Sequence, residues 1–409
     1  MADIKAFSAY RPRKDIVDKV AALPYDVYNR REAKEVVSKN PLSFLKIDRA
    51  ETSFDDDFDM YSPAVYAKAK ELLDKMIVDG EYVLEEKDVY YIYELIMDGR
   101  HQTGIVACAS IDDYINGVIK KHENTREEKE LDRITHVDTC NAQTGPIFLA
   151  YRAQDKIDAV VDNVKKGEPL YSFVSEDGIG HNVWIIDRQE DIDTIKNEFN
   201  NLSDIYIADG HHRAASAVKV GIKRRKENPE ASYRESDFFL SVLFPHNQLK
   251  ILPYNRVVKD LNGYSESEFL DKIREAFEVE KVSNKYMPDS KYTYGMYLNR
   301  SWYKLTAKEN IKSSDPVEGL DVSILQNNLL KPILGIDDPR VDKRIDFVGG
   351  IRGLEELERR VNSDMEIAFS MYPTSIDELF SVADANMLMP PKSTWFEPKL
   401  RSGIFIHKL

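Results

Sequence analysis

A strand that runs directly into a glycine turn and a helix is the feature that most constrains this chain. Residues 205–208 read Ile-Tyr-Ile-Ala, which is the apolar, β-branched and aromatic character of a buried strand. Asp209 and Gly210 then form a turn, and the alanine-rich run from Ala214 to about Lys226 predicts a helix. Because the first turn of a helix leaves N–H groups unpaired at the positive end of its dipole, such a junction favours an anion.

The turn also carries side chains that suit a phosphate group. Gly210 lets the backbone approach a phosphate closely, and Arg213 offers a planar guanidinium that holds two oxygens. The histidines at 211 and 212 can donate to oxygens or move a proton. The alternative is an ordinary Asp-Gly turn whose histidines only cap the helix. The sequence predicts a phosphate or nucleotide site at Asp209, Gly210, His211, His212 and Arg213.

Composition and charge limit the possible functions. The chain has 409 residues, which suggests two domains or one large elaborated domain. Its formal net charge of −14 argues against a protein that binds nucleic acid through a basic face. Its two cysteines, Cys108 and Cys140, form no CxxC motif and indicate a reducing compartment. No signal-peptide core and no run of membrane-spanning length is present, so we expect a cytoplasmic protein that binds no membrane.

A second polar stretch, His122-Glu123, leads into a charged helix. Lys129, Arg133 and His136 recur at spacings of three and four in that helix and therefore share one face. The pattern predicts that this face lines a substrate site. The alternatives are a solvated polar face for the helix and an ordinary surface ion pair for His122 and Glu123.

Hydrophobic periodicity predicts alternating helices and strands along the rest of the chain. Ser62 followed by Pro63 marks a helix start, and Asp98-Gly99 between two strands predicts a hairpin. We divide the chain into a catalytic core at 1–245 and a C-terminal α+β lobe at 246–409. The expected helices are 32–39, 63–79, 155–166, 189–201, 265–277, 321–330, 354–361 and 375–385, and the expected strands are 89–97, 103–110, 147–151, 181–187, 238–244, 292–298, 302–305, 366–371 and 403–407.

Three motifs, His122-Glu123, Asp209–Arg213 and Pro391-Lys392-Ser393-Thr394, stand in this order in the chain. The middle motif resembles the phosphate loop of the ParB/sulfiredoxin superfamily, and its Asp-Gly-His-His-Arg form resembles the free serine kinases of that group. In those kinases a His-Glu pair precedes the loop and a Pro-Lys-Thr-Thr segment lies near the C-terminus. The whole chain resembles a widespread prokaryotic family of unassigned function that carries His-Glu-Asn-Thr, Asn-Ala-Gln-Thr-Gly-Pro and Asp-Gly-His-His-Arg signatures.

These resemblances imply an α/β protein, more closely mixed α+β, with a ParB/sulfiredoxin-like catalytic core. The additional C-terminal lobe is expected to return its last segment to the active site. By position, Glu123 matches the base that deprotonates the substrate hydroxyl, and Asp209 becomes a candidate ligand of Mg²⁺. The predicted catalytic residues are Glu123, His122 and His212. The resemblance implies substrate binding by Lys392, Ser393 and Thr394, and the polar helix face predicts it for Lys129, Arg133 and His136. This chain has Trp395-Phe396 where those kinases have basic residues.

The predicted function is transfer of a phosphoryl group from ATP, ADP or pyrophosphate, with Mg²⁺, to a small hydroxyl metabolite. Free L-serine, giving O-phosphoserine, is the expected acceptor. One alternative is a metal-dependent phosphohydrolase or nuclease that uses the histidines and acids of the same motifs. The other is a non-catalytic nucleotide-binding regulator. Sulfiredoxin chemistry is disfavoured because His211 stands where that reaction needs a cysteine, and the acidic balance disfavours DNA partitioning.

Overall fold

The computed structural model describes residues 1–125 and 127–409, which form two compact units. Unit 1 comprises Met1–Leu249 together with Pro398–Leu409, and unit 2 comprises Lys250–Glu397. The predicted division falls after residue 245, with the whole remainder in the second part. In the structure the chain leaves unit 1 after Leu249 and returns to it at Pro398.

Unit 1 is built on a mixed nine-stranded sheet with the order β6-β11-β8-β12-β5-β4-β10-β9, in which β1 also pairs with β5. Two further short pairs, β2–β3 and β7–β21, lie outside it. The strands are β1 (Ile4–Lys5), β2 (Tyr10–Pro12), β3 (Tyr82–Leu84), β4 (Tyr90–Met97), β5 (Arg100–Ser110), β6 (Ile119–Lys120), β7 (Ala142–Gln143), β8 (Ile147–Tyr151), β9 (Tyr171–Val174), β10 (Gly180–Ile186), β11 (Ile205–Asp209), β12 (Phe238–Pro245) and β21 (His407–Lys408).

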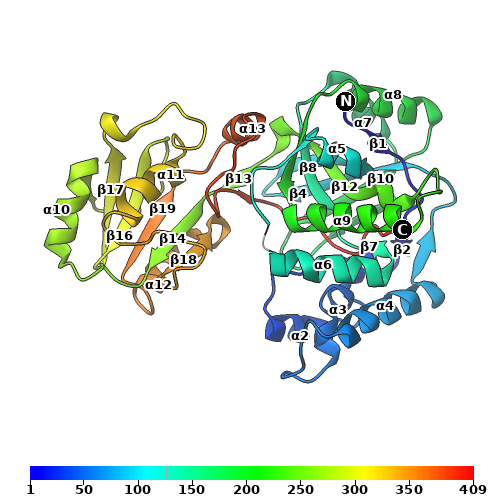
Figure 1. The fold of residues 1–409 in the computed structure, drawn as a ribbon, viewed down its shortest axis with the longest axis horizontal. Helices are drawn as coiled ribbons and strands as arrows, with labels where there is room; N and C mark the ends of the chain where they lie inside the picture. The colour runs from blue at the N-terminus through cyan, green and yellow to red at the C-terminus, as the bar shows by residue number, and fades with distance from the viewer. Residues whose placement is uncertain (126) are drawn as a thin grey trace. The chain divides into compact units, whose positions relative to one another are not determined.

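Helices cover this sheet, and α6 and α9 lie side by side against it (Figure 1). Helix α4 packs on α6 and on α3, so these N-terminal helices extend the layer outward. The helices of unit 1 are α1 (Val17–Val20), α2 (Arg30–Lys39), α3 (Leu45–Asp48), α4 (Pro63–Val78), α5 (Ile111–Ile115), α6 (Glu127–Cys140), α7 (Asp155–Val164), α8 (Gln189–Asn200) and α9 (His211–Glu227).

Local sequence signals set two of these elements. Asp98 and Gly99 both adopt positive φ angles, 52° and 75°, and join β4 to β5 in the predicted antiparallel hairpin. Ser62 accepts a hydrogen bond at the N-terminus of α4, with Pro63 in the first helical position. The predicted hairpin and helix are therefore confirmed.

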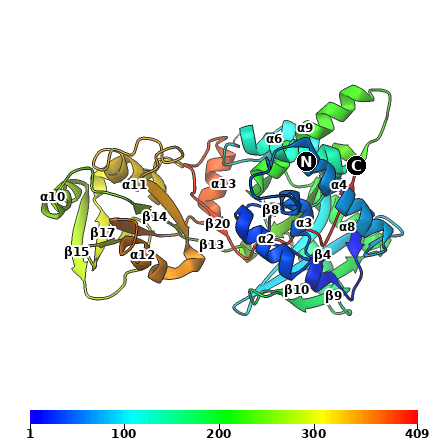
Figure 2. The same ribbon diagram turned by 90° about the horizontal axis from the view of Figure 1, so that it is seen from below.

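Unit 2 contains an antiparallel six-stranded sheet with the order β15-β17-β16-β19-β14-β18, and a separate pair β13–β20. Helix α12 packs on one face through Leu354 and Leu357, whereas α11 lies on the other, where the backbone carbonyl of Asp321 accepts a hydrogen bond from Tyr294 (Figure 2). The elements of unit 2 are β13 (Ile251–Leu252), β14 (Tyr254–Val258), α10 (Glu266–Ala276), β15 (Phe277–Val282), β16 (Thr293–Leu298), β17 (Ser301–Ala307), α11 (Asp321–Leu325), a π-helical turn (Gln326–Leu330), β18 (Ile345–Gly349), α12 (Gly353–Val361), β19 (Ile367–Met371), α13 (Ile376–Asp384) and β20 (Trp395–Phe396).

The last segment of the chain runs through the interior of unit 1. Phe405 is fully buried, and its ring contacts Tyr91 and Tyr93 on β4. The predicted strand at 403–407 is not formed as one strand, because its backbone groups pair with several different segments. Ile406 pairs with Tyr10, the N–H of residue 403 donates to residue 144, and only His407–Lys408 joins a ladder with β7.

The fold class predicted from the sequence, mixed α+β with a core and an additional C-terminal lobe, is confirmed. Throughout residues 1–125 and 127–409, no helix has the length and apolar character needed to cross a bilayer.

Candidate functional site

The predicted strand–glycine–helix junction is present. Strand β11 ends at Asp209, Gly210 occupies the N-cap position with φ 93° and ψ 31°, and α9 begins at His211. The helix starts before the alanine-rich run at Ala214, so both histidines and Arg213 lie in its first turn. Within residues 1–125 and 127–409, no side chain forms a capping hydrogen bond at this helix start, whose dipole end is positive and suits an anion.

Glycine is required at position 210 by both its backbone angle and its surroundings. A Cβ atom there would lie 3.0 Å from Nε and 3.0 Å from Nη2 of Arg213. The guanidinium of Arg213 folds back beside the turn and donates a hydrogen bond of 2.7 Å from Nη1 to the carbonyl oxygen of Pro146. This bond fixes the charge of Arg213 next to the backbone of the junction.

Sheet topology brings the His122-Glu123 motif to the same place. Strands β6 and β11 pair in parallel, with Ile119 opposite Ile205, so their carboxyl ends meet at one edge of the sheet. His122 follows β6 and packs edge-on against His211, with 4.6 Å between the ring centroids. The backbone N–H of His122 donates to Nε2 of His211 over 3.5 Å.

Asp209 lies between two positive side chains. Its Oδ2 is 3.4 Å from Nζ of Lys399 and 3.8 Å from Nη2 of Arg213. Burial raises the pKa of the Asp209 carboxyl, but the charges of Lys399 and Arg213 outweigh burial and lower that pKa to about 2. Asp209 is therefore ionised at neutral pH, and the three side chains carry a net positive charge.

Both buried histidines of the site are held in the neutral form. Burial lowers the pKa of His122 to about 4, against the opposing effect of Asp209. Burial, followed by the neighbouring His122, also lowers the pKa of His211 well below its ordinary value. Since Nε2 of His211 accepts a hydrogen bond, the proton of its neutral ring belongs on Nδ1.

Glu123 and His212, the other predicted catalytic residues, are half-buried at this edge of the sheet. Glu123 lies in the loop between β6 and α6, directly after His122. Thr125, in the same loop, donates a 2.7 Å hydrogen bond to Glu130 on α6 and ties the loop to that helix. His212 is on the first turn of α9, where its carbonyl oxygen accepts from Ser216. The structure thus brings the two motifs together, and their catalytic roles remain predictions.

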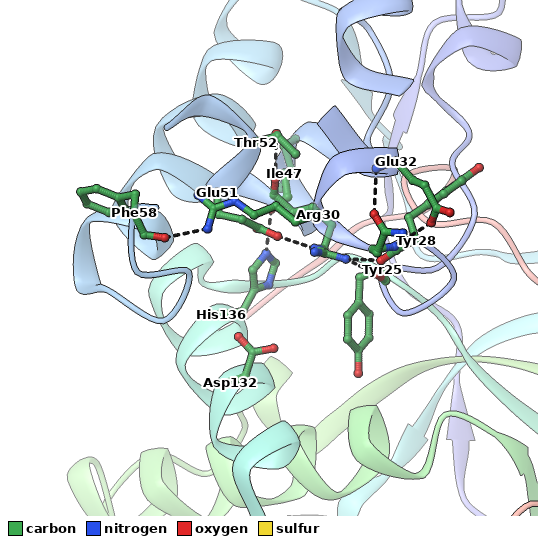
Figure 3. Close-up of polar contacts among 12 residues, drawn as sticks. Tyr25, Tyr28, Arg30, Glu32, Ile47, Glu51, Thr52, Phe58, Asp132 and His136 are labelled. Atoms are coloured by element: carbon green, nitrogen blue, oxygen red, sulfur yellow. Dashed lines mark hydrogen bonds and ion pairs between the residues drawn. The ribbon is translucent and has the colours of Figure 1, made fainter. Parts of the chain in front are cut away.

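The predicted face of α6 lines a cavity rather than an open surface. Arg133 is 8% exposed and His136 is 3% exposed, whereas Lys129 is exposed at the cavity edge. Arg133 pairs with Asp132 at 2.9 Å, and its guanidinium stacks 4.1 Å from the ring centroid of Tyr25. Figure 3 shows His136 reaching from the same helix to the carbonyl oxygen of Ile47, which lies 3.1 Å from Nε2.

This cavity continues to Arg213 in the loop at 209–213. Its outer part measures about 890 Å³ and its inner part about 450 Å³, and both volumes include space open to solvent. Both parts share four lining residues, Tyr25, Asp48, Arg133 and His136, and the inner part is also lined by Arg213. The cavity therefore connects the α6 face with the loop at 209–213 inside unit 1.

Sequence reasoning missed several residues of this cavity. Tyr25 and Asp48 come from N-terminal segments that carried no recognisable motif, and Ser402 comes from the returning C-terminal segment. Asp48 accepts a 2.9 Å hydrogen bond from Thr144, a residue in the predicted Asn-Ala-Gln-Thr-Gly-Pro signature. That signature was the one available indication that this region contributes to the site.

The predicted segment Lys392–Thr394 lies in unit 2 and makes its contacts there. Lys392 is exposed, has a positive φ of 58°, and places Nζ 5.4 Å from the ring centroid of Tyr254. Ser393 is buried and donates its hydroxyl hydrogen to the carbonyl oxygen of Pro390 over 2.6 Å. Thr394 is half-buried. Substrate binding by Lys392, Ser393 and Thr394 remains a prediction.

The donor set at the junction suits an anion better than a bare metal ion. Across the described residues, no three His, Cys, Asp or Glu side chains gather in an arrangement that could hold a metal. Asp209, the predicted magnesium ligand, already has Lys399 and Arg213 beside it. A magnesium ion at this site would therefore need phosphate oxygens to supply most of its ligands.

The fold and the site define a mixed α+β protein with a strand–glycine–helix junction beside a polar cavity. The chain belongs to the protein family of unknown function DUF1015, whose model matches residues 4–323. The predicted membership of a family of unassigned function is thereby confirmed. No curated protein matches the chain significantly.

Several solved structures are distantly similar to this chain. A free serine kinase in complex with AMP is 14% identical over 73% of this chain and 91% of its own, with a TM-score of 0.36. SbnI with a C-terminal truncation, from Staphylococcus aureus, is 10% identical over 72% of this chain and 85% of its own, with a TM-score of 0.38. A conserved hypothetical protein from Pyrococcus furiosus is 13% identical over 74% and 94%, with a TM-score of 0.36.

Proposed function

We propose that this protein is a kinase that transfers a phosphoryl group from ATP, ADP or pyrophosphate to a small hydroxyl metabolite, with free L-serine as the acceptor. The observation that carries the proposal is the parallel pairing of β6 with β11. It sets the His122-Glu123 motif against the Asp209–Arg213 loop, so a candidate base and a candidate phosphate site share one edge of the sheet.

The charges at the junction support binding of the phosphoryl donor. Lys399 and Arg213 exceed the single negative charge of Asp209, and the N-terminus of α9 adds a positive dipole end. Phosphoryl transfer asks a protein mainly for positioning and for stabilisation of negative charge that moves to the leaving oxygen. Arg213, fixed by its bond to Pro146, is preorganised for that task.

Glu123 is proposed as the general base that takes the proton of the acceptor hydroxyl. His122 and His211 are neutral at physiological pH, so neither ring adds a positive charge beside this glutamate. A positioned base of this kind contributes about a hundred- to ten-thousand-fold to a rate. His212, on the first turn of α9, is the alternative base.

The cavity beside the loop supports a small polar acceptor. An amino acid such as serine presents a carboxylate and an ammonium group, and this cavity offers side chains of both charges in Arg133, Lys129 and Asp48. Arg213 lines the inner part of the same cavity. An acceptor bound there would therefore lie next to the proposed phosphate loop. Bound Mg²⁺ would neutralise donor phosphate charge, with Asp209 as its protein ligand.

The proposal is tested by phosphorus NMR of the purified protein with magnesium, L-serine and each donor in turn. The expected result is a new phosphomonoester resonance that appears only when serine and one of the donors are both present. Release of inorganic phosphate without serine would favour the phosphohydrolase alternative. Donor binding by calorimetry with no turnover across a panel of hydroxyl acceptors would favour the regulator.

A further inference from the structure

A buried arginine in unit 2 has no carboxylate partner. Arg256, on β14, is 3% exposed, and among residues 1–125 and 127–409 no acidic side chain forms an ion pair with it. Its Nη1 donates to the carbonyl oxygen of Tyr254, and its Nη2 donates to that of Lys392 over 3.1 Å. These two main-chain acceptors use only part of a guanidinium that has five N–H donors.

Such a charge is costly to bury unless an anion compensates it. A guanidinium removed from water without a counter-charge loses its hydration, and a buried charge is normally paired. Burial lowers the pKa of Arg256 to about 10, which shows that its surroundings disfavour the charged form. The ring of Phe347, 5.4 Å from the guanidinium carbon, offers it only a cation–π contact.

Arg256 also lines a cavity of about 700 Å³, including space open to solvent. The cavity lies on the face of the sheet where α11 packs. Seven of its lining residues are apolar or aromatic: Val322, Leu330, Pro339, Ile345, Phe347, Pro390 and Pro391. Its wall includes both ends of the π-helical turn, Gln326 and Leu330. Such turns are rare and often occur at functional sites.

The charges at the cavity edge narrow the class of ligand. Asp338 is paired with Arg340 at 2.7 Å, and Asp337 with Lys331 at 3.5 Å, so these four charges balance one another. Among the described residues that line the cavity, Arg256 is the one whose charge has no counter-charge, which suits a monoanion. Two acidic side chains at the edge and largely apolar walls disfavour a strongly hydrated dianion such as phosphate.

We propose that this cavity of unit 2 binds a small organic acid, whose carboxylate pairs with the guanidinium of Arg256 and whose apolar body packs on Phe347 and Val322. A carboxylate accepts two parallel hydrogen bonds from a guanidinium, which is the geometry that the remaining donors of Arg256 can supply. All the residues involved belong to unit 2, so the proposal is independent of the phosphoryl-transfer site.

Calorimetry of the full chain with benzoate, benzamide and inorganic phosphate as probes tests the proposal. Benzoate should bind, and benzamide, which has the same shape without the charge, should bind at least tenfold more weakly. Arg256→Met should weaken benzoate binding at least tenfold, whereas the matched control Arg360→Met should change it by less than twofold, since Arg360 pairs with Asp346 and Asp364 and does not line the cavity. Equal binding of benzamide, or tighter binding of phosphate, would overturn the proposal.

A second measurement on the unaltered protein covers the case in which the Arg256 variant does not fold. Crystals of the full chain soaked with 4-bromobenzoate should show an anomalous bromine peak in the cavity, with the carboxylate at Arg256. Absence of a peak there at a soak concentration above the calorimetric dissociation constant, or a peak only elsewhere, would contradict the assignment.

Discussion

Oδ2 of Asp209 and Nζ of Lys399 lie 3.4 Å apart although 190 positions separate the two residues in the chain. Asp209 ends β11, and Lys399 belongs to the segment that returns to unit 1 after Pro398. The loop at 209–213 is therefore completed by the C-terminal end of the chain. Through this contact, the second half of the sequence can influence the charge of the proposed phosphate site.

Replacing Lys399 with methionine should weaken binding of the phosphoryl donor about 10- to 150-fold, the scale of one lost charge-assisted contact. It should also move the pKa of the Asp209 carboxyl upward from about 2, because one of the two charges that lower it is removed. Calorimetry measures the first effect and carboxyl-detected NMR titration the second. The control is Lys408→Met in the same segment, where the lysine contacts Asp74 instead. If both variants bind the donor equally well, Lys399 has no part in the site.

Glu123→Gln should leave binding of donor and acceptor nearly unchanged and remove most of kcat. Glutamine keeps the size and hydrogen bonding of glutamate but cannot take a proton at neutral pH, so only transition-state stabilisation is lost. Steady-state kinetics gives the separation of kcat from KM. Glu127→Gln, an exposed position at the start of α6, is the matched control and should retain activity. Activity of the Glu123 variant within a few-fold of the unaltered protein would transfer the role of base to His212.

Arg213→Ala should weaken donor binding by about 1.5–3 kcal/mol, the range for hydrogen bonds to a charged group. The guanidinium is fixed by its bond to Pro146, so a water molecule cannot replace it with the same orientation. Arg224→Ala on the same helix is the control, because that arginine contacts Asp138 and Asn141 instead. An unchanged dissociation constant for the Arg213 variant, with a native circular dichroism spectrum, would remove the loop from the donor site.

Gly210→Ala should lower the affinity for the phosphoryl donor in addition to the stability of the fold. An alanine at φ 93° costs about 1–2 kcal/mol, and its Cβ would also displace the guanidinium of Arg213. Gly117→Ala provides a matched comparison, because Gly117 has φ 76° but no atom within 4 Å of the added Cβ. Both variants should lose thermal stability, and only the Gly210 variant should lose donor affinity. Equal donor affinity in the two would show that the position of Arg213 is unimportant.

Those parts of the fold that depend on local chemistry could be predicted from the sequence. The strand at Ile147–Tyr151 has its predicted bounds, because the turn residues before it and the polar residues after it limit a short continuous apolar run. Helix α9 begins earlier than its alanine-rich run because a positive-φ glycine ends the strand and starts the helix at His211. The sequence predicts the turn at Asp209 and Gly210, but its alanine-rich run predicts the helix only from Ala214 onward.

The parts of the site that depend on contacts between distant segments could not be predicted in this way. Tyr25 reaches the cavity only because the N-terminal helices pack on α6, and nothing in its local sequence distinguishes it from a core tyrosine. Lys399 contacts Asp209 because the chain leaves unit 2 and returns to unit 1, which no periodic pattern encodes. Lys392 and Lys399 are about seven positions apart in the sequence, yet they belong to different units.

Asp321, on α11 of unit 2, provides a prediction about pH and stability. Burial is the main cause that raises its pKa to about 7, against the opposing effect of a 2.8 Å hydrogen bond from the backbone N–H of Tyr292. Because the folded protein holds this proton up to about pH 7 and the unfolded chain releases it near pH 4, the folded state binds more protons between these values. The free energy of unfolding of unit 2 should therefore fall as pH rises from 4 to 7, at up to about 1.4 kcal/mol per pH unit.

Asp321→Asn should remove this decline, because asparagine keeps an oxygen for the N–H of Tyr292 and has no proton to lose. Hydrogen exchange of amides in β16, which adjoins Asp321 through Tyr294, measures the stability of unit 2 separately from that of unit 1. Asp315→Asn is the control, because the backbone N–H groups of residues 317 and 318 lower the pKa of that exposed carboxyl instead of raising it. In this variant the free energy of unfolding of unit 2 should still fall between pH 4 and 7. A decline of the same size in the Asp321 variant would show that another group titrates in this range.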